Sequence, residues 1–313
     1  MQAASGLVGK EIVVPGSIAN MGPGFDTLAI AVEIYLRLKI TRVDPARTGL
    51  QFHFTDKAPD GENYIERAFR HLADSLGPRN IPGPTNISGN GHALPFLEVE
   101  ASSDIPMKGG LGSSAAATVA GLRLFEAVYG AVSQGELLAA ATVLEGHPDN
   151  AAAALLGGLT VCCQRSDGSV AATSCPWPEA WEFLVLTPEL GLATKKSRGV
   201  LPSTLSMADA VANLQRVGMI VAAAHSGDES LLAGVFDDRL HQPYRQELVP
   251  GLAEILKLRH PQILGAFLSG SGPSIAVVVR GNGKEAQELL NEAYRPLGIP
   301  FQVRRLRVYS HRG

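Results

Sequence analysis

The stretch at residues 106–116, PMKGGLGSSAA, limits the fold of this chain more than any other segment. Its glycines, Gly109, Gly110 and Gly112, carry no Cβ, so the backbone can adopt positive φ and bring its N–H groups close to an anion. Two serines and an alanine-rich run follow, which predicts a helix over residues 115–129 whose free N–H groups and partial positive charge face the loop. The sequence therefore predicts a phosphate-binding loop that opens into a helix.

This glycine loop matches neither of the two commoner phosphate-binding patterns. It lacks the Gly-x-x-x-x-Gly-Lys-Ser/Thr order of a P-loop, and its glycines do not follow Gly-x-Gly-x-x-Gly. A lone glycine-rich loop is more often a turn before a core helix than a nucleotide site. The complete eleven-residue pattern decides between the two interpretations.

That pattern, Pro-x-x-x-Gly-Leu-Gly-Ser-Ser-Ala-Ala, resembles the signature of the GHMP small-molecule kinases, which include galactokinases, homoserine kinases and mevalonate kinases. The resemblance implies that ATP is the nucleotide and that the loop binds its phosphates. It also places Asn63 near the adenine, because the residues around Asn63 match the family as well. The predicted ATP-binding residues are Asn63, Pro106, Met107, Lys108, Gly109, Gly110, Leu111, Gly112, Ser113, Ser114, Ala115 and Ala116.

A second motif, PGSIANMGPGFD at residues 15–26, is rich in turn-forming residues, which predicts a loop from residue 17 onward. The segment also closely resembles the N-terminal motif of the homoserine kinases within the same family. That resemblance implies that Asn20 and Asp26 lie at the substrate hydroxyl. Mevalonate kinases carry a lysine and galactokinases an arginine soon after this Pro-Gly, whereas this chain has Ser17 there.

A third motif, EGHPDN at residues 145–150, could by itself be a histidine and a capping aspartate at the start of a helix. Followed by Gly-Gly-Leu, it again resembles the homoserine kinase pattern. The resemblance implies that Glu145, together with Ser114 or Ser113, binds Mg²⁺, whose preferred ligands are oxygens. It also implies that His147 and Asn150 line the pocket for L-homoserine.

The second half of the chain supplies further candidates for the substrate site. Taken alone, Thr194 and Arg198 would belong to a solvated, lysine-rich surface segment, but the resemblance makes them ligands for the polar end of the amino acid. Arg245, in the motif HQPYR, matches a second family arginine, and its planar fork suits a carboxylate. Gly270, in LSGSGPS, belongs to what resembles the third family motif, which closes over nucleotide and substrate.

Hydrophobic periodicity predicts strands and helices that mix without a regular βαβ alternation, which favours an α+β fold. The resemblance implies the two-domain GHMP kinase fold, with a ribosomal-protein-like α+β domain at residues 1–170 and a ferredoxin-like α+β domain at 171–313. The boundary falls in the polar, proline-containing stretch 164–178. We predict helices at 63–76, 115–129, 136–145, 151–156, 208–224 and 284–294, and strands at 10–14, 29–41, 50–54, 97–101, 159–163, 181–187, 276–280 and 301–308.

Composition excludes several classes of protein. The 313 residues carry a formal charge of −3 and 45% hydrophobic residues, which fits a folded enzyme and argues against a basic nucleic-acid-binding surface. Three cysteines give neither a disulfide framework nor zinc spacing. Neither a signal peptide nor a membrane span is indicated. We therefore expect a cytoplasmic protein with small-molecule partners, no nucleic acid and no membrane, and a homodimer is a candidate assembly.

Together these motifs predict a homoserine kinase of the GHMP family, which transfers phosphate from ATP to the side-chain hydroxyl of L-homoserine in threonine biosynthesis. The catalytic candidates are Asn20, Asp26 and Asn150. The proton acceptor is open, because Asn150 stands where mevalonate kinases have an aspartate, and Asp26 is the nearest alternative. Positioning and charge stabilisation can suffice without a base. The alternatives are a mevalonate-pathway kinase and a catalytically silent, ligand-sensing member of the family.

Overall fold

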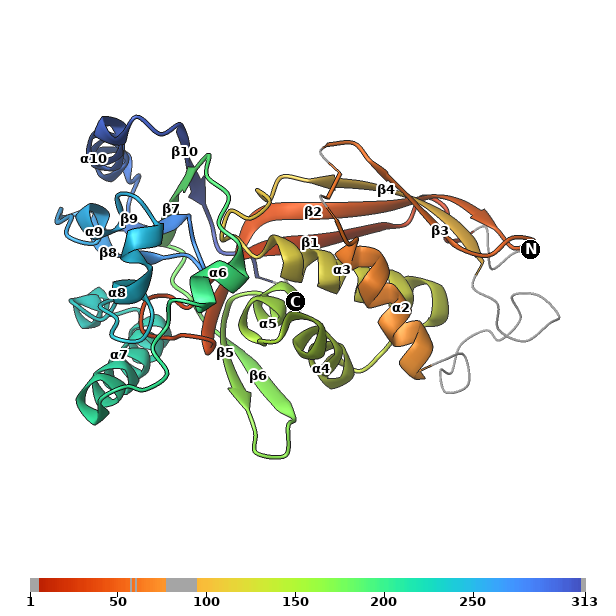
Figure 1. Cartoon of the computed structure of the whole chain (residues 1–313), viewed down its shortest axis with the longest axis horizontal. Coiled ribbons are helices and arrows are strands. Elements are labelled where there is room, and N and C mark those ends of the chain that lie inside the picture. The colour runs from red at the N-terminus through yellow and green to blue at the C-terminus, as the bar shows by residue number, and fades with distance from the viewer. Residues whose placement is uncertain (1–5, 57, 60, 77–94, 311–313) are drawn as a thin grey trace.

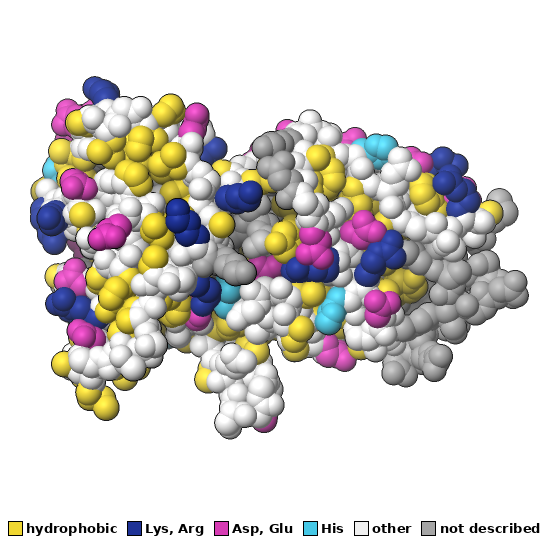
Figure 2. All heavy atoms as spheres, viewed as in Figure 1, with side chains coloured by type: hydrophobic (Ala, Val, Ile, Leu, Met, Phe, Trp, Pro, Cys, Tyr) yellow, Lys and Arg dark blue, Asp and Glu magenta, His cyan; other side chains and the backbone are white. Residues whose placement is uncertain are grey.

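The computed structural model describes residues 6–56, 58–59, 61–76 and 95–310. These residues form two lobes, with α6 (Thr194–Arg198) lying between them (Figure 1). On the face shown in Figure 2, basic and acidic side chains are interspersed over both lobes, and the surface narrows between them. Within the described part of the chain, no helix combines the length and the apolar character needed to span a bilayer.

The first lobe is a mixed sheet with four helices on one face (Figure 1). Strand β2 is central: its outer part alternates buried Ile34, Leu36 and Leu38 with exposed Arg37 and Lys39, which is the pattern of a strand with one wet face. The described strands follow the order β3-β4-β2-β5-β6, and β1 also pairs with β2. Their bounds are β1 Glu11–Ala19, β2 Leu28–Asp44, β3 Leu50–Phe54, β4 Phe96–Ser103, β5 Leu159–Gln164 and β6 Val170–Cys175.

Three of the four helices of this lobe have predicted ATP or metal residues at one end: Asn63, the serines of the glycine loop and Glu145. Helix α4 begins with a capping box between Ser133 and Glu136 and ends at Gly146, whose φ of 81° stops the helix directly after Glu145. The helices are α2 Tyr64–Leu76, α3 Ser113–Tyr129, α4 Gln134–Glu145 and α5 Asp149–Leu156. The expected helices are thus present, although the loop predicted from residue 17 onward begins three residues later, because β1 continues to Ala19 and pairs there with β2.

The second lobe has the β-α-β-β-α-β order of a ferredoxin-like domain, as predicted. Its antiparallel sheet runs β10-β7-β9-β8, so the first strand, β7, lies inside the sheet. The strands are β7 Trp181–Pro188, β8 Ile263–Leu268, β9 Ile275–Arg280 and β10 Phe301–Leu306. The helices are α7 Met207–Ser226, α8 Gln242–Arg245, α9 Leu252–Ile255 and α10 Lys284–Tyr294, with 3₁₀ turns at Glu229–Leu232, Gln246–Leu248 and Arg295–Leu297.

The chain passes from the first sheet to the second between Cys175 and Trp181. Strand β6 begins at Val170 and pairs with β5 along its whole length. The sequence-based boundary after residue 170 therefore falls at the start of a strand of the first sheet, and the change of sheet comes a few residues later.

Helix α7 buries only half of the face on which its regularly spaced apolar residues lie. Of the four residues that share that face, Val217 and Val221 pack against the core, but Val211 and Leu214 are 41% and 72% exposed. The inner side instead carries Asn213, whose side chain bonds to the first lobe and to a buried aspartate. Tertiary hydrogen bonding thus sets the rotation of this helix.

After β10 the chain returns to the first lobe. Tyr309 donates its backbone N–H to the carbonyl of Ala31 and accepts one from Gly158. Single bridges also join Val308 to Val32 and Ser310 to Gly157. The last described residues therefore lie between β2 and the start of β5, and connect the two lobes a second time.

Candidate active site

The glycine loop, residues 106–116, has the backbone that an anion-binding turn requires. Lys108, Gly110 and Gly112 have φ of 55°, 80° and 70°. Gly112 immediately precedes α3 and offers no side-chain cap. Within the described residues, the N–H groups of Ser113 and Ser114 donate to no protein acceptor, so the helix N-terminus can bind an anion.

Residues of the second lobe donate hydrogen bonds to carbonyl groups of the glycine loop. Ser269 donates its hydroxyl to the carbonyl of Gly110 at 2.6 Å, and the N–H of Ser274 donates to the carbonyl of Gly109 at 3.2 Å. A Cβ on Gly110 would lie 2.6 Å from the carbonyl oxygen of Ser269. The N–H of Gly109 donates to the carbonyl of Pro106, and within the described part of the chain the N–H groups that follow, up to Ser114, are left for a ligand.

Glu145, at the end of α4, holds two hydroxyls of α3 with its two oxygens. Ser114 donates to Oε2 and Thr118 donates to Oε1, both at 2.7 Å. The Glu145 side chain is 5% exposed, and the guanidinium of Arg67 lies 4.0 Å from Oε1. A carboxylate with hydroxyl neighbours beside an anion-binding helix end is an all-oxygen donor set that suits Mg²⁺.

The loop after β1 is a strained turn. Asn20, Met21 and Asp26 have φ between 44° and 68°, a region that residues with a side chain rarely adopt. The carboxamide of Asn20 fixes the turn, because Oδ1 accepts the N–H of Asp26 at 3.0 Å and Nδ2 donates to the carbonyl of Gly270 at 2.8 Å. This use of the amide leaves Asn20 one N–H for a ligand.

Asp26 and Arg198 form a two-bond ion pair. Nη1 and Nη2 of Arg198 donate to the two carboxylate oxygens at 2.9 and 2.6 Å. Burial, the largest single influence, lowers the pKa of Arg198, but the hydrogen bonds to Asp26 and the charges of Asp26 and Asp149 together raise that pKa by more, so the net direction is upward. Asp26 therefore presents a paired carboxylate, and Arg198 keeps its outer N–H groups for an anion.

Arg198 and Arg245 converge on the ring of Phe25. Their guanidinium carbons lie 5.2 and 5.4 Å from the ring centroid, and the ring of His241 lies 5.3 Å away. Burial and the nearby charge of Arg198 lower the pKa of Arg245 to about 10. We call Phe25, Asp26, Arg198, His241 and Arg245 the arginine pocket.

The N-terminus of α5 joins the glycine loop to this pocket. Nδ1 of His147 lies 2.6 Å from Oδ1 of the buried Asp149. Burial, the largest single influence, lowers the pKa of His147, but the hydrogen bond to Asp149 and the charges of Asp149 and Asp26 together raise it by more, and the net shift is upward. Asn150 accepts the hydroxyl of Ser17 on Oδ1 at 2.8 Å, and a Cβ on Gly112 would lie 3.0 Å from that Oδ1.

One cluster could be mistaken for a second metal site. Asp26, His147 and Asp149 bring ligand-type atoms within 4.8 Å of one another. Two of these groups are already bonded to each other, and Asp26 is paired with the cation Arg198. A metal ion here would meet the guanidinium charge, so we interpret the cluster as part of a polar ligand pocket.

For two predicted residues, Asn63 and Thr194, the structure shows contacts with other protein groups. Asn63 caps α2, because Oδ1 accepts the N–H groups of Ile65 and Glu66 at 3.1 and 3.3 Å. Thr194, at the start of α6, pairs its hydroxyl with that of Ser271 at 3.3 Å. The adenine contact of Asn63 and the substrate contact of Thr194 stay predictions.

Sequence reasoning missed several residues that shape the site. Thr118 follows the glycine loop by one helical turn, and that spacing from Ser114 could have indicated it. The sequence marks Ser17 only as a difference from the lysine of mevalonate kinases and the arginine of galactokinases, yet its hydroxyl orients Asn150. The bonds of Asp238 to Asn213 and of His241 to Gly22 could not be predicted, because these partners lie far away along the chain.

Two sequence profiles match the chain. Residues 63–158 match the N-terminal domain of the GHMP kinases, and residues 206–296 match the C-terminal domain of the GHMP kinases. The homoserine kinase of Moorella thermoacetica is 36% identical over 95% of this chain and 97% of its own length.

Solved structures of this fold are similar over nearly the whole chain. The crystal structure of homoserine kinase from Cytophaga hutchinsonii has a TM-score of 0.79 at 25% identity, covering 95% of this chain and 94% of that one. The L. major mevalonate kinase in complex with R-mevalonate has a TM-score of 0.67 at 18% identity, covering 97% of each chain. The mevalonate kinase shares the fold, and the homoserine kinases share sequence as well.

Proposed function

The chain belongs to the GHMP kinase family, and from that premise we infer that it transfers the γ-phosphoryl group of ATP to the side-chain hydroxyl of L-homoserine. The product is O-phospho-L-homoserine. The similarity to homoserine kinases over nearly the full chain supports this substrate, whereas the mevalonate kinase neighbour supports the fold alone.

One observation carries the choice of substrate: the arginine pocket offers both signs of charge beside an anion-binding loop. Arg198 and Arg245 suit a carboxylate, because a guanidinium bonds it through two parallel N–H groups. The carboxylates of Asp26 and of the neighbouring Asp149 supply negative charge for an ammonium group. An amino acid such as homoserine carries both groups, and its hydroxyl is the atom left to react.

The glycine loop is the proposed site for the ATP phosphates, which its free N–H groups and the N-terminus of α3 would bind. Asn63 is the proposed contact near the adenine. Glu145 and Ser114 are the proposed ligands of Mg²⁺, and Thr118 would hold Glu145 in place. Bound there, the metal would neutralise charge on the β- and γ-phosphates.

We propose that no side chain acts as a strong base. Asn150 offers an amide, and because Oδ1 accepts from Ser17, the group left for a ligand is the Nδ2 donor. Asp26 is engaged by Arg198 through both oxygens. Phosphoryl transfer through a loose transition state needs the hydroxyl placed in line more than it needs early deprotonation, and Asn20, Asn150 and His147 would place it.

A coupled ADP-release assay tests the activity. Purified protein is given ATP and, in turn, homoserine, serine, threonine, mevalonate and galactose. We expect homoserine to give the highest kcat/KM. Preferential turnover of mevalonate would contradict the substrate, and no turnover of any alcohol would indicate a ligand-sensing member of the family.

Glu145→Gln tests the metal site, since it keeps the shape of the side chain but removes the charge that a hard divalent ion prefers. We expect kcat to fall by about 100-fold or more and the affinity for Mn²⁺, measured by titration in the presence of ATP, to fall as well. Homoserine binding should persist. Glu136→Gln, in the capping box of the same helix, is the matched control. Equal metal affinity in the Glu145 variant and the wild type would remove Glu145 from the site.

Two further proposals concern the protein in the cell. A cytoplasmic location is consistent with the substrate and with three free cysteines. A homodimer is the assembly we propose, and light scattering after size-exclusion chromatography distinguishes it from a monomer.

A further inference from the structure

Arg245 is a buried cation held by neutral acceptors. The residue is 1% exposed. Its Nε donates to the carbonyl of Ser197, and its Nη1 donates to the carbonyl of Gly270 and to Nδ1 of His241, each at 3.1 Å. Among the described residues, no carboxylate bonds to this guanidinium. Its charge is therefore available to an anionic ligand, unlike that of Arg198, which Asp26 pairs.

The imidazole of His241 connects Arg245 to the strained loop after β1. Its Nε2 lies 2.8 Å from the carbonyl oxygen of Gly22 and 3.5 Å from Oδ2 of Asp238, and both oxygens accept. Its Nδ1 faces Nη1 of Arg245, which can only donate. Two acceptors at one nitrogen and a donor at the other assign the ring proton to Nε2.

The ring of His241 is neutral near pH 7. Burial lowers its pKa to about 4, with Arg245 acting in the same direction and Asp238 and Asp26 opposing it. A neutral ring with its proton on Nε2 can accept from the guanidinium. An imidazolium could not, because both of its nitrogens donate.

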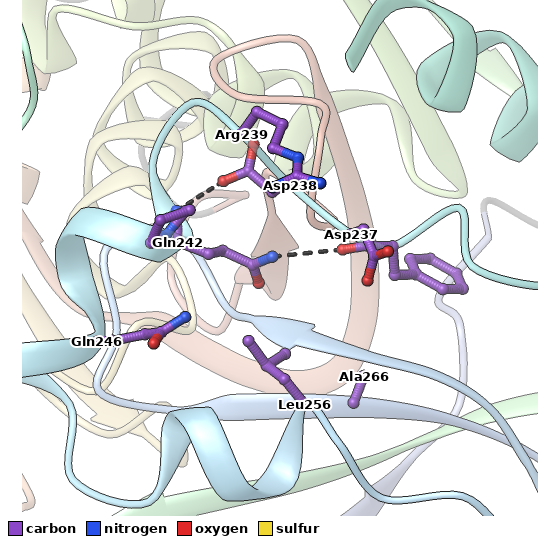
Figure 3. Close-up of a pocket in the computed structure, with 9 residues that line it drawn as sticks. Asp237, Asp238, Arg239, Gln242, Gln246, Leu256 and Ala266 are labelled. Carbon is purple, nitrogen blue, oxygen red and sulfur yellow. Dashed lines mark hydrogen bonds between the residues drawn. The ribbon is translucent and has the colours of Figure 1, made fainter. Parts of the chain in front are cut away.

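Asp238 holds the ring in this orientation. The carboxylate accepts the backbone N–H groups of Leu240 and His241 at 2.8 Å each and that of Gln242 at 2.6 Å. It also accepts Nδ2 of Asn213 at 2.7 Å. Asp238 and Gln242 line one side of an open cavity of about 370 Å³ (Figure 3). These bonds fix the start of α8, and so the direction in which Arg245 leaves it.

The same group of residues fastens the substrate loop. Asn213, on α7, donates to the carbonyl of Pro23 at 3.0 Å and accepts the N–H of Arg239 at 2.9 Å. The carbonyl of Gly22, one residue earlier, accepts from His241. A Cβ on Gly22 would collide with the backbone of Phe236. The loop that carries Asn20 and Asp26 is thus held against the residues that hold Arg245.

We propose that His241 is a positioning residue for recognition of the substrate carboxylate, and that it acts by accepting a hydrogen bond from Arg245 and fixing the guanidinium in the arginine pocket. This inference rests on the proposed homoserine kinase activity. His241 touches neither nucleotide nor the reacting hydroxyl in this scheme. Its effect should therefore appear in the KM for homoserine and disappear when Arg245 is absent.

A double-mutant cycle tests the proposal. We measure kcat and KM for homoserine and for ATP in the wild type, in His241→Phe, in Arg245→Ala and in the double variant. Phenylalanine keeps the contact with Phe25 but removes both hydrogen bonds. We expect His241→Phe to raise the homoserine KM roughly 10- to 100-fold, to leave the KM for ATP within about threefold, and to add little in the Arg245→Ala background.

Equal factors in the two backgrounds would overturn the proposal, because His241 would then act independently of Arg245. Homoserine carboxamide gives a second measurement: its KM should change little in His241→Phe, and a loss equal to that for homoserine would count against carboxylate recognition. A wild type that does not phosphorylate homoserine contradicts the proposed function instead. Tyr244→Phe, at an exposed position on the same helix, is the control and should match the wild type.

The tautomer can be measured without any destabilising change. Long-range ¹⁵N–¹H spectra of the wild-type protein at pH 7 distinguish a ring protonated on Nε2 from one protonated on Nδ1 or on both nitrogens. We expect the signals of His241 to show a protonated Nε2 and a bare Nδ1. Either other form would overturn the proposal even if His241→Phe fails to fold. His241→Gln, whose carboxamide keeps a donor and an acceptor, should recover part of the lost homoserine affinity.

Discussion

The glycine loop and the arginine pocket prepare for charged groups in opposite ways. The loop is one contiguous run that offers backbone N–H groups, and its carbonyls are taken up by the second lobe. The pocket is assembled from side chains of the loop after β1, α6 and α8, and each guanidinium bonds to at least one residue far away in sequence. A substitution that adds a side chain should therefore disrupt the glycine loop, whereas the loss of a hydrogen bond should disrupt the arginine pocket.

The largest effect should come from adding a side chain to the loop. Gly112→Val requires positive φ from a β-branched residue and drives the new Cβ into the hydroxyl of Ser17. We expect ATP binding, measured by calorimetry, to be abolished. Gly135→Ala on α4, where a Cβ meets no neighbour within 4 Å, is the glycine control and should bind ATP normally. A folded Gly112 variant with unchanged nucleotide affinity would remove the loop from the nucleotide site.

The next largest effect should be a loss of homoserine affinity when one cation is removed from the arginine pocket. Arg245→Ala leaves a desolvated substrate carboxylate short of a partner, which typically costs about 2 to 5 kcal/mol, or roughly thirty- to several-thousand-fold in affinity. The loss should appear for homoserine and not for ATP. The measurement compares homoserine with its carboxamide. A wild type that uses both equally well, or a variant that loses the same factor on both, would show that Arg245 does not bind the carboxylate.

Acid should weaken the pocket through a group that the loop lacks, since backbone N–H groups do not titrate. His241 has its pKa depressed to about 4 in the folded protein, so below its ordinary value of 6.5 the unfolded chain binds a proton that the folded chain does not. Stability therefore falls as the pH drops from about 6.5 toward 4, by on the order of 3 kcal/mol. The raised pKa of His147 has the opposite effect on stability. It stabilises the folded protein at low pH, and this stabilisation is lost as the pH rises.

Urea unfolding at several pH values, in the wild type and in His241→Phe, measures this contribution. The slope of unfolding free energy against pH between 4.5 and 6.5 should be smaller in the variant. Parallel slopes in the two proteins would mean that His241 does not carry the acid sensitivity.

The smallest effect should come from the residue that joins the two regions. Ser17→Ala removes the hydroxyl that holds Oδ1 of Asn150, so the amide can rotate. We expect kcat to fall roughly tenfold while the KM values for ATP and homoserine change little. Ser206→Ala, at the exposed cap of α7, should lower stability without lowering kcat. A normal kcat in the Ser17 variant would indicate that Asn150 is oriented by other contacts.

The difference between a contiguous loop and a pocket built from distant segments also explains what could be predicted from the sequence. The glycine loop, the α+β fold and most elements were predictable because each depends on residues close together in the chain. Strand β8, the rotation of α7 and the partners of Arg245 were not, because they depend on pairing between distant segments. Asn213 is an example: its polar side chain faces inward on α7, and only the folded structure supplies Pro23 and Asp238 as its partners.

The return of residues 308–310 to the first sheet has a consequence for biosynthesis. Val308 and Tyr309 bond to the inner end of β2, and Ser310 bridges to the residue that ends α5. These residues leave the ribosome after the whole second lobe has been made. The first lobe can collapse early during translation, but its sheet acquires the contacts of residues 308–310 only after the second lobe has been synthesised. Folding of the first lobe is thereby completed by residues 308–310, and the two lobes mature together.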